Sequence, residues 1–271
     1  MHWAAANGAD RVEILAERGA ADLARRAGLL NDEPGPSIAV WRVDGAELSE
    51  AAPAPPAAPP AIPASHWALA GVMSEAGARP LDDHGQLVAE VAGLEVGRVV
   101  DDGDGPVIDV GVGQADRELA QLVHREPDPG VGLRRVIAAV ADYRRPGSHH
   151  PLTRVGRERW LRSVILEEPG LVGAEALEPV VPLRARSGLR RSEPAAAAGP
   201  GTTGRPLLVV TMVGADLDLI PEAADYRQRW NPAAELLVAV PARDLALSTG
   251  LLDRVADARA VALPTPWLAS V

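Results

Sequence analysis

Two aspartates directly follow a strongly apolar segment of the chain. Residues 207–213 read Leu-Leu-Val-Val-Thr-Met-Val, and Asp216 and Asp218 come shortly after them. Ligands of open α/β sheets bind beyond the carboxyl ends of the strands, and Mg²⁺ and Mn²⁺ prefer carboxylate oxygens. The pair therefore predicts a divalent-metal site. The alternative is that one of the two aspartates caps the next helix, which carries Pro221 in its first turn.

A second acidic pair, Glu95 and Asp109, lies in a predicted β-hairpin. Residues 87–100 alternate in the manner of a strand, the segment Asp-Asp-Gly-Asp-Gly-Pro forms the turn, and residues 107–113 return. This pairing puts both carboxylates on one face, together with Gly97 and Gly111. A carboxylate cluster over small residues suits a metal or a general acid/base pair. An amphipathic hairpin with its polar face in water is the alternative.

Arginines cluster in residues 149–165, His-His-Pro-Leu-Thr-Arg-Val-Gly-Arg-Glu-Arg-Trp-Leu-Arg-Ser-Val-Ile. Guanidinium groups bind phosphates through two parallel hydrogen bonds, and arginine beside an aromatic residue suits nucleic acid. The alternative is that Trp160 packs in the core while the arginines pair with acids elsewhere. The candidates for phosphate or nucleic-acid binding are Arg154, Arg157, Arg159 and Arg162.

Missing residue types exclude several reaction classes. The chain has 27 arginines but no lysine, no cysteine and no phenylalanine. Without an amine there is no Schiff-base nucleophile, pyridoxal anchor or phosphate-loop lysine, and without a thiol there is no cysteine nucleophile. No pyridoxal, thiol-based or haem cofactor is implied, which leaves Mg²⁺ or Mn²⁺. Ser248 does not complete a serine hydrolase, because no histidine follows His150.

The charge is negative overall and unevenly distributed. The net charge is −10, yet residues 117–191 hold 14 arginines against 9 acids. The total argues against a general polyanion binder, whereas the asymmetry suits a polyanion partner or attraction between two parts of the same protein. The first twenty positions include five charged residues and no apolar core segment, and the longest apolar stretch is shorter than the ~20 residues that a membrane span needs. We therefore expect a cytoplasmic protein with no membrane partner.

Proline and glycine divide the chain into blocks. Six prolines in residues 51–64 predict a linker, and Gly and Pro in 193–205 predict a second one. We expect a helix near 9–29 and a strand at 37–43 in a first block, residues 1–50. The middle block, 65–192, should hold a short helix, the hairpin and three arginine-rich helices.

The last block, residues 206–271, alternates apolar runs with helical patterns. The expected elements are a strand at 207–213, a helix at 219–230, a strand at 235–240, a helix at 247–256 and a strand at 260–263. This order predicts parallel strands joined by crossover helices. Some sixty-five residues form a thin core alone, so the block should share a sheet with an earlier one. The predicted class is α/β, with a mixed sheet, the middle hairpin, a C-terminal βαβαβ unit and helices packed on the sheet.

Four segments carry a resemblance to known proteins: GLEVGRVV, IDVGVGQADRE, HPLTRVGRERWLR and GADLDLIPEAADYR. Together they resemble a conserved group of uncharacterised actinobacterial proteins, over most of residues 65–271. The resemblance implies a bacterial cytoplasmic origin and no particular activity. The strand–hairpin–helix core with acidic residues is also faintly similar to restriction-endonuclease-like nucleases, although Glu95-Val96-Gly97 lacks the lysine of their Glu-x-Lys signature.

Three functions follow as hypotheses. The leading one is a non-catalytic α/β protein that binds a protein partner or a small ligand. The second is a divalent-metal-dependent phosphoesterase or nuclease, with Asp216 and Asp218, or Glu95 and Asp109, holding the metal. The third is nucleic-acid binding through the arginines of residues 134–162.

Overall fold

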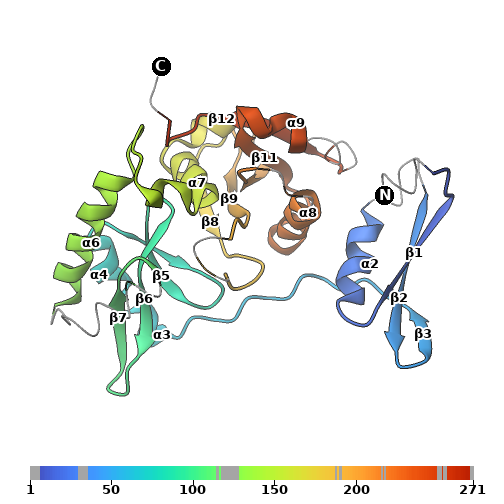
Figure 1. The fold of residues 1–271 in the computed structure, drawn as a ribbon, viewed down its shortest axis with the longest axis horizontal. Coiled ribbons are helices and arrows are strands. Elements are labelled where there is room, and N and C mark those ends of the chain that lie inside the picture. The colour runs from blue at the N-terminus through green and yellow to red at the C-terminus, as the bar shows by residue number, and fades with distance from the viewer. Residues whose placement is uncertain are drawn as a thin grey trace.

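The described residues form three separate β-sheets, each with its own helices (Figure 1). The computed structural model describes residues 7–29, 36–113, 116, 128–186, 188, 191–214, 216, 218–248, 252 and 255–268. No helix in these ranges is long and apolar enough to cross a membrane. The class is α/β with mixed sheets, as the sequence predicts.

The N-terminal sheet is small and has three strands. Its elements are β1 (Arg11–Ala16), α2 (Ala20–Gly28), β2 (Ser37–Asp44) and β3 (Glu47–Glu50). Strand β1 runs parallel to β2, and β3 pairs antiparallel with β2. The predicted helix over 9–29 is thus wrong in its first half. Val12 and Ile14 alternate with charged residues at period two, which favours a strand, and Gly19, at φ +66°, starts the helix only afterwards.

Two arginines of α2 join this N-terminal block to an aspartate about 200 residues later in the chain. Arg25 and Arg26 each donate a hydrogen bond from Nε to Asp225, one to each carboxylate oxygen, at 2.8 Å. Arg25 and Asp225 are 7% and 3% exposed, so this ion pair is buried. Asp225 belongs to α8 (Leu219–Trp230), which lies beside α2 in Figure 1.

The proline-rich segment 51–63 contains neither helix nor strand, and both of its ends pack in hydrophobic cores. Ala51 lies in the N-terminal core and Ile62 in the core of the middle sheet. The carbonyl of Ala54 accepts a hydrogen bond from Arg25, and Pro60 packs so closely on Gly85 that a Cβ there would clash. The segment is therefore a strap held by contacts along its length.

The middle sheet is a four-stranded antiparallel meander, β4-β5-β6-β7. Its elements are α3 (Ala64–Trp67), α4 (Ala70–Glu75), β4 (Arg79–Asp82), β5 (Leu87–Val91), β6 (Leu94–Asp101) and β7 (Pro106–Val110). The first predicted hairpin strand is in fact two strands, since the chain reverses at Ala92-Gly93, where Gly93 has φ +78°. The second turn lies where the Asp-Gly steps predict it. Helix α6 (Pro129–Tyr143) covers the sheet with Leu133 and Val140.

The C-terminal sheet has five strands in the order β12-β11-β10-β9-β8. Its elements are η2 (Pro169–Val172), β8 (Glu178–Val180), β9 (Ala195–Pro200), β10 (Pro206–Thr211), α8, β11 (Glu235–Pro241), η3 (Ala242–Asp244), α9 (Leu245–Ser248) and β12 (Ala258–Leu263). Strands β10, β11 and β12 are parallel, as the predicted βαβαβ unit requires. The helix predicted at 247–256 differs in its bounds, since α9 begins at Leu245, and residues 249–251, 253 and 254 lie outside the described residues. Strands β8 and β9 add antiparallel on the other side of β10, so segments before residue 206 share this sheet.

Strand β9 corrects the prediction that residues 193–205 form a linker. Alanine and glycine have low strand propensity, yet Ala195–Ala198 are at most 5% exposed, and Ala196–Ala198 pair on both sides. Close packing around β9 requires small side chains at these positions. A Cβ on Gly199 would overlap the carbonyl oxygen of Ala176.

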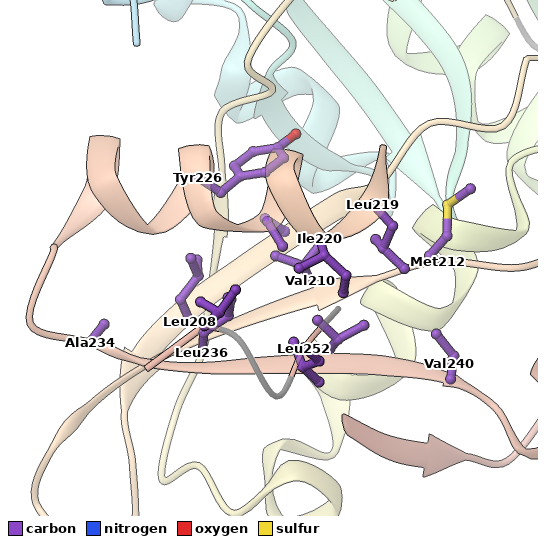
Figure 2. Packing of buried hydrophobic residues seen from close by; sticks show 14 of the residues in the cluster. Leu208, Val210, Met212, Leu219, Ile220, Tyr226, Ala234, Leu236, Val240 and Leu252 are labelled. Atoms are coloured by element: carbon purple, nitrogen blue, oxygen red, sulfur yellow. The ribbon is translucent and has the colours of Figure 1, made fainter. Parts of the chain in front are cut away.

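Helices cover both faces of the C-terminal sheet. Figure 2 shows Leu219 and Ile220 of α8 facing Leu208 and Val210 on one face, and Tyr226 of α8 belongs to the same buried cluster. The other face takes Trp160, Leu161 and Ile165 of α7 (Arg157–Glu167), which follows η1 (Pro151–Arg154). Helix α7 also contacts the middle sheet, where Arg162 binds Glu90 of β5. It thus lies between two sheets.

Candidate functional site

A pocket of about 260 Å³ opens at the carboxyl end of β10. Thr211, the last residue of β10, pairs with Ala195, the first of β9, because the two strands are antiparallel. The segment leading into β9 and the segment leaving β10 therefore meet at one edge of the sheet. The lining residues are Arg184, Arg191, Ser192, Glu193, Pro194, Met212, Asp216, Asp218 and Glu222.

Both aspartates of the first predicted metal pair line this pocket. Asp216 is half-buried, and its Oδ1 accepts a hydrogen bond from the backbone N–H of Asp218 at 2.9 Å. Asp218 is exposed and occupies the N-cap position of α8, but its side chain makes no capping hydrogen bond. Asp218 thus occupies the predicted N-cap position, but its carboxylate does not cap the helix.

Glu222 is a pocket residue that the sequence analysis missed. It is 3% exposed, and its Oε2 accepts a hydrogen bond from Nη2 of Arg184 at 2.7 Å. Burial raises the pKa of Glu222, and the charges of Asp216 and Glu193 add to the rise, whereas Arg184 and Arg26 oppose it. The signal in the sequence is its spacing: Glu222 follows Asp218 by one helical turn and so shares its face of α8.

The raised pKa of Glu222 gives a pH-dependent prediction. An acid whose pKa is higher in the folded state costs stability as the pH rises through that pKa. Glu222→Gln should therefore be as stable as the wild type at pH 7 or more stable, by about 1 kcal/mol or less. The gain should shrink as the pH falls toward the unfolded-state pKa of about 4.3, because both states then become protonated.

Urea denaturation of both proteins at pH 7 and pH 4 measures this difference. Glu47→Gln, on the exposed strand β3, is the matched control and should change little at either pH. A loss of stability in Glu222→Gln at pH 7 but not at pH 4 would contradict the expected sign.

Arg184 is held in place by a segment that spans two parts of the fold. Arg229 of α8 donates hydrogen bonds to the carbonyl oxygens of Val181 and Pro182. A ring nitrogen of His84, from the β4–β5 turn, lies 3.1 Å from the same Pro182 carbonyl oxygen. The backbone before Arg184 is thus fixed between α8 and the middle sheet.

The second acidic pair lies elsewhere, on the meander. A β-bulge at Ala89/Glu90 puts Glu95 opposite Glu90, and Arg98 lies opposite Asp109. This register brings Glu95, Arg98 and Asp109 to one face of the sheet. Arg98 binds Glu95 with two hydrogen bonds of 2.7 and 2.9 Å. The expected position of Gly97 on that face is wrong, because a Cβ there would meet Leu133 in the core.

The four predicted phosphate-binding arginines do not share one surface. Arg154 is exposed at the end of η1, and Arg157 donates to the Thr153 carbonyl and lies 4.7 Å over the Trp267 ring. Arg159 and Arg162 are 6% and 2% exposed. The insertion of α7 between two sheets buries these last two. Within the described residues no group of three or more His, Cys, Asp or Glu side chains forms a metal cage.

The pocket therefore contains one of the two predicted acidic pairs, Asp216 and Asp218. The other acidic pair and the predicted phosphate-binding arginines do not line it. No protein-family model, curated protein or solved structure matches this chain. Functional inference consequently depends on the geometry of the site itself.

Proposed function

We propose that the protein binds a small cationic ligand in the pocket beyond β10. The observation that carries this proposal is the charge of the lining, where four carboxylates face two guanidinium groups. Arg184 is engaged by Glu222, and Arg191 lies 3.6 Å from Glu193. Asp216 and Asp218 then supply the carboxylates for the ligand. The position at the carboxyl end of a parallel strand is where open α/β sheets bind their ligands.

A volume of about 260 Å³ suits a hydrated divalent cation or a short organic amine. Both present positive charge to carboxylate oxygens. A divalent ion would be held by Asp216 and Asp218 with water completing its shell. A diamine would instead extend toward Glu193 and Glu222.

A thermal melt with millimolar Mn²⁺ or Mg²⁺, or with a short aliphatic diamine, tests the proposal. A ligand at about 100 times its dissociation constant should add ~2.7 kcal/mol of stability to the wild type. Asp216→Asn/Asp218→Asn should lose that gain, and the asparagine at position 218 remains a good N-cap residue. The metal and the diamine arms identify which cation is bound.

Asp109→Asn is the matched control, because it removes a carboxylate from the other acidic candidate. It should respond to the ligand as the wild type does. A wild type that responds to none of the cations, or a double variant that responds in full, would rule out this pocket as a cation site.

A second candidate function is divalent-metal-dependent phosphoester hydrolysis. The observation in its favour is that Arg184 and Arg191 line the same pocket as Asp216 and Asp218. A metal on the aspartates and a phosphate on the arginines would lie side by side. Metal-dependent turnover of a chromogenic phosphodiester, lost in the double aspartate variant, would establish this function.

A further inference from the structure

The N-terminal block, made of β1, α2, β2 and β3, has a hydrophobic core of its own. The buried residues of this core and the apolar side chains packed against it all belong to residues 14–51. Its three-stranded sheet is separate from the two other sheets. Since the described residues share neither core nor sheet between this block and the rest of the chain, the block has the parts of an independent domain.

Charged groups join the N-terminal block to the C-terminal sheet. Arg25 and Arg26 of α2 each donate a hydrogen bond of 2.8 Å to Asp225 of α8. The side chains of Arg25 and Asp225 are 6% and 4% exposed, so both ions lose their water when α2 docks on α8. The cost of removing that water offsets much of the attraction in a buried ion pair, and the net free energy of docking is therefore small.

Arg25 keeps a counter-ion when the block leaves α8. Asp22, one helical turn earlier on α2, accepts a hydrogen bond of 2.8 Å from Nη1 of Arg25, and its side chain is 62% exposed. The side chain of Arg26 is already 25% exposed and only has to become fully hydrated. Release of the block thus leaves neither arginine buried without a partner, whereas loss of the Asp225 charge from the docked state would do so.

The segment between the block and the middle sheet allows such a movement. Residues 51–63 contain six prolines and neither helix nor strand. A proline-rich spacer of this length is semi-rigid and spans roughly 40 Å. Ile62 fixes its far end in the core of the middle sheet, whereas Ala54, near the block, accepts a hydrogen bond from Arg25.

A separate core, a junction made by charges and a proline-rich tether together describe a hinged domain. We propose that the N-terminal block is a detachable domain, held on α8 by Asp225 and released as a folded unit on the proline-rich segment. Release uncovers the carboxylate of Asp225 and both guanidinium groups of α2 at the same time. Arg25, Arg26 and Asp225 do not line the pocket beyond β10, so this device is separate from the proposed cation site.

Single-molecule energy transfer between two dyes tests the proposal on the full chain. The chain has no cysteine, so Ser49→Cys on β3 and Thr203→Cys in the β9–β10 turn, both exposed, carry the dyes at defined positions. With Asp225 intact and at low salt, the labelled protein should give one narrow population of high transfer efficiency. Asp225→Asn should move most molecules to a broad population of lower efficiency, because the docked block would bury Arg25 without its counter-charge.

Asp22→Asn is the matched control, because it removes the other carboxylate bonded to Arg25 but leaves Asp225 in place. It should keep the population of high efficiency. If Asp225→Asn does not fold, Arg25→Gln/Arg26→Gln breaks the same contact from the other side and should give the same shift. Salt provides a test without a variant: 1 M NaCl, which shortens the screening length to about 3 Å, should enlarge the released population at least twofold over 0.1 M.

Unchanged transfer efficiency in the Asp225 and arginine variants, or in 1 M NaCl, would overturn the proposal. Hydrogen exchange of the β1–β2 backbone amides tests whether the released block stays folded. These amides should remain protected in Asp225→Asn, and loss of their protection would show that the block unfolds when it leaves α8. Asp216→Asn/Asp218→Asn should keep the block docked, so failure of the cation site and failure of this device are distinguishable.

Discussion

Glu90→Gln should lower the free energy of unfolding by about 3–5 kcal/mol, the usual cost of removing one partner from a buried ion pair. Nη2 of Arg162 lies 2.7 Å from both carboxylate oxygens of Glu90, and the two side chains are 3% and 5% exposed. The substitution leaves Arg162 buried without a counter-charge, close to Arg159 and Arg186. No solvent is available to compensate for the loss.

The same pair sets a pH dependence. Burial would raise the pKa of Glu90, but the charges of Arg162, Arg159 and Arg186 together lower it below its ordinary value. An acid with a lowered pKa contributes stability above its unfolded-state pKa, and that contribution is lost as the pH falls through the folded-state pKa. The difference between wild type and Glu90→Gln should therefore be full at pH 7 and shrink on acidification below about pH 4.5.

Urea denaturation at pH 7, 5 and 3 measures this difference. Glu95→Gln is the control, because its partner Arg98 is 34% exposed and can be solvated, so its loss should be nearer 1 kcal/mol. Glu90→Leu/Arg162→Met should recover most of the stability, since it removes both charges together. Equal losses in the Glu90 and Glu95 variants would show that burial does not decide the effect.

Gly93→Ala should cost about 2–5 kcal/mol, the sum of a left-handed backbone and an overpacked contact. Gly93 closes the β5–β6 turn against α7. A Cβ there would lie 2.5 Å from the carbonyl carbon of Arg159 and 2.8 Å from Cα of Trp160. Both are backbone atoms, which cannot move without shifting the helix away from the middle sheet.

Gly45→Ala isolates the backbone contribution. Gly45 has φ +59° in the β2–β3 turn, but a Cβ there would meet nothing within 4 Å. Its loss in urea denaturation should be about 1–2 kcal/mol, the strain of the left-handed conformation alone. If the free energy of unfolding fell by the same amount in Gly93→Ala and Gly45→Ala, the contact between the β5–β6 turn and α7 would contribute nothing to stability.

The C-terminal half of the fold was predictable because its signals are local. The apolar runs at 207–213 and 235–240 are long, and the segment between them has a helical pattern, so strand, helix and strand follow in order. Strand β9 was not predictable in this way. Its alanines form a strand only because β10 pairs with all four of them and β8 with three.

The candidate pocket was predictable only in part, for a similar reason. Asp216 and Asp218 follow their strand directly, and local pattern locates them. Arg184 and Arg191 reach the same pocket from the β8–β9 connection, which tertiary packing alone places there. The exposure of the α7 arginines depends on the two sheets that enclose the helix, and the helix sequence does not contain that information.

The ion pairs between α2 and Asp225 can form only after both of these distant segments have been synthesised. Arg25 and Asp225 are 200 residues apart in the chain. At about 5–20 residues per second, the ribosome synthesises Asp225 about 10–40 s after Arg25. During that interval the first block has no α8 to dock on, and its two arginines remain hydrated. The N-terminal block thus receives its final position from a helix that is synthesised about 200 residues later.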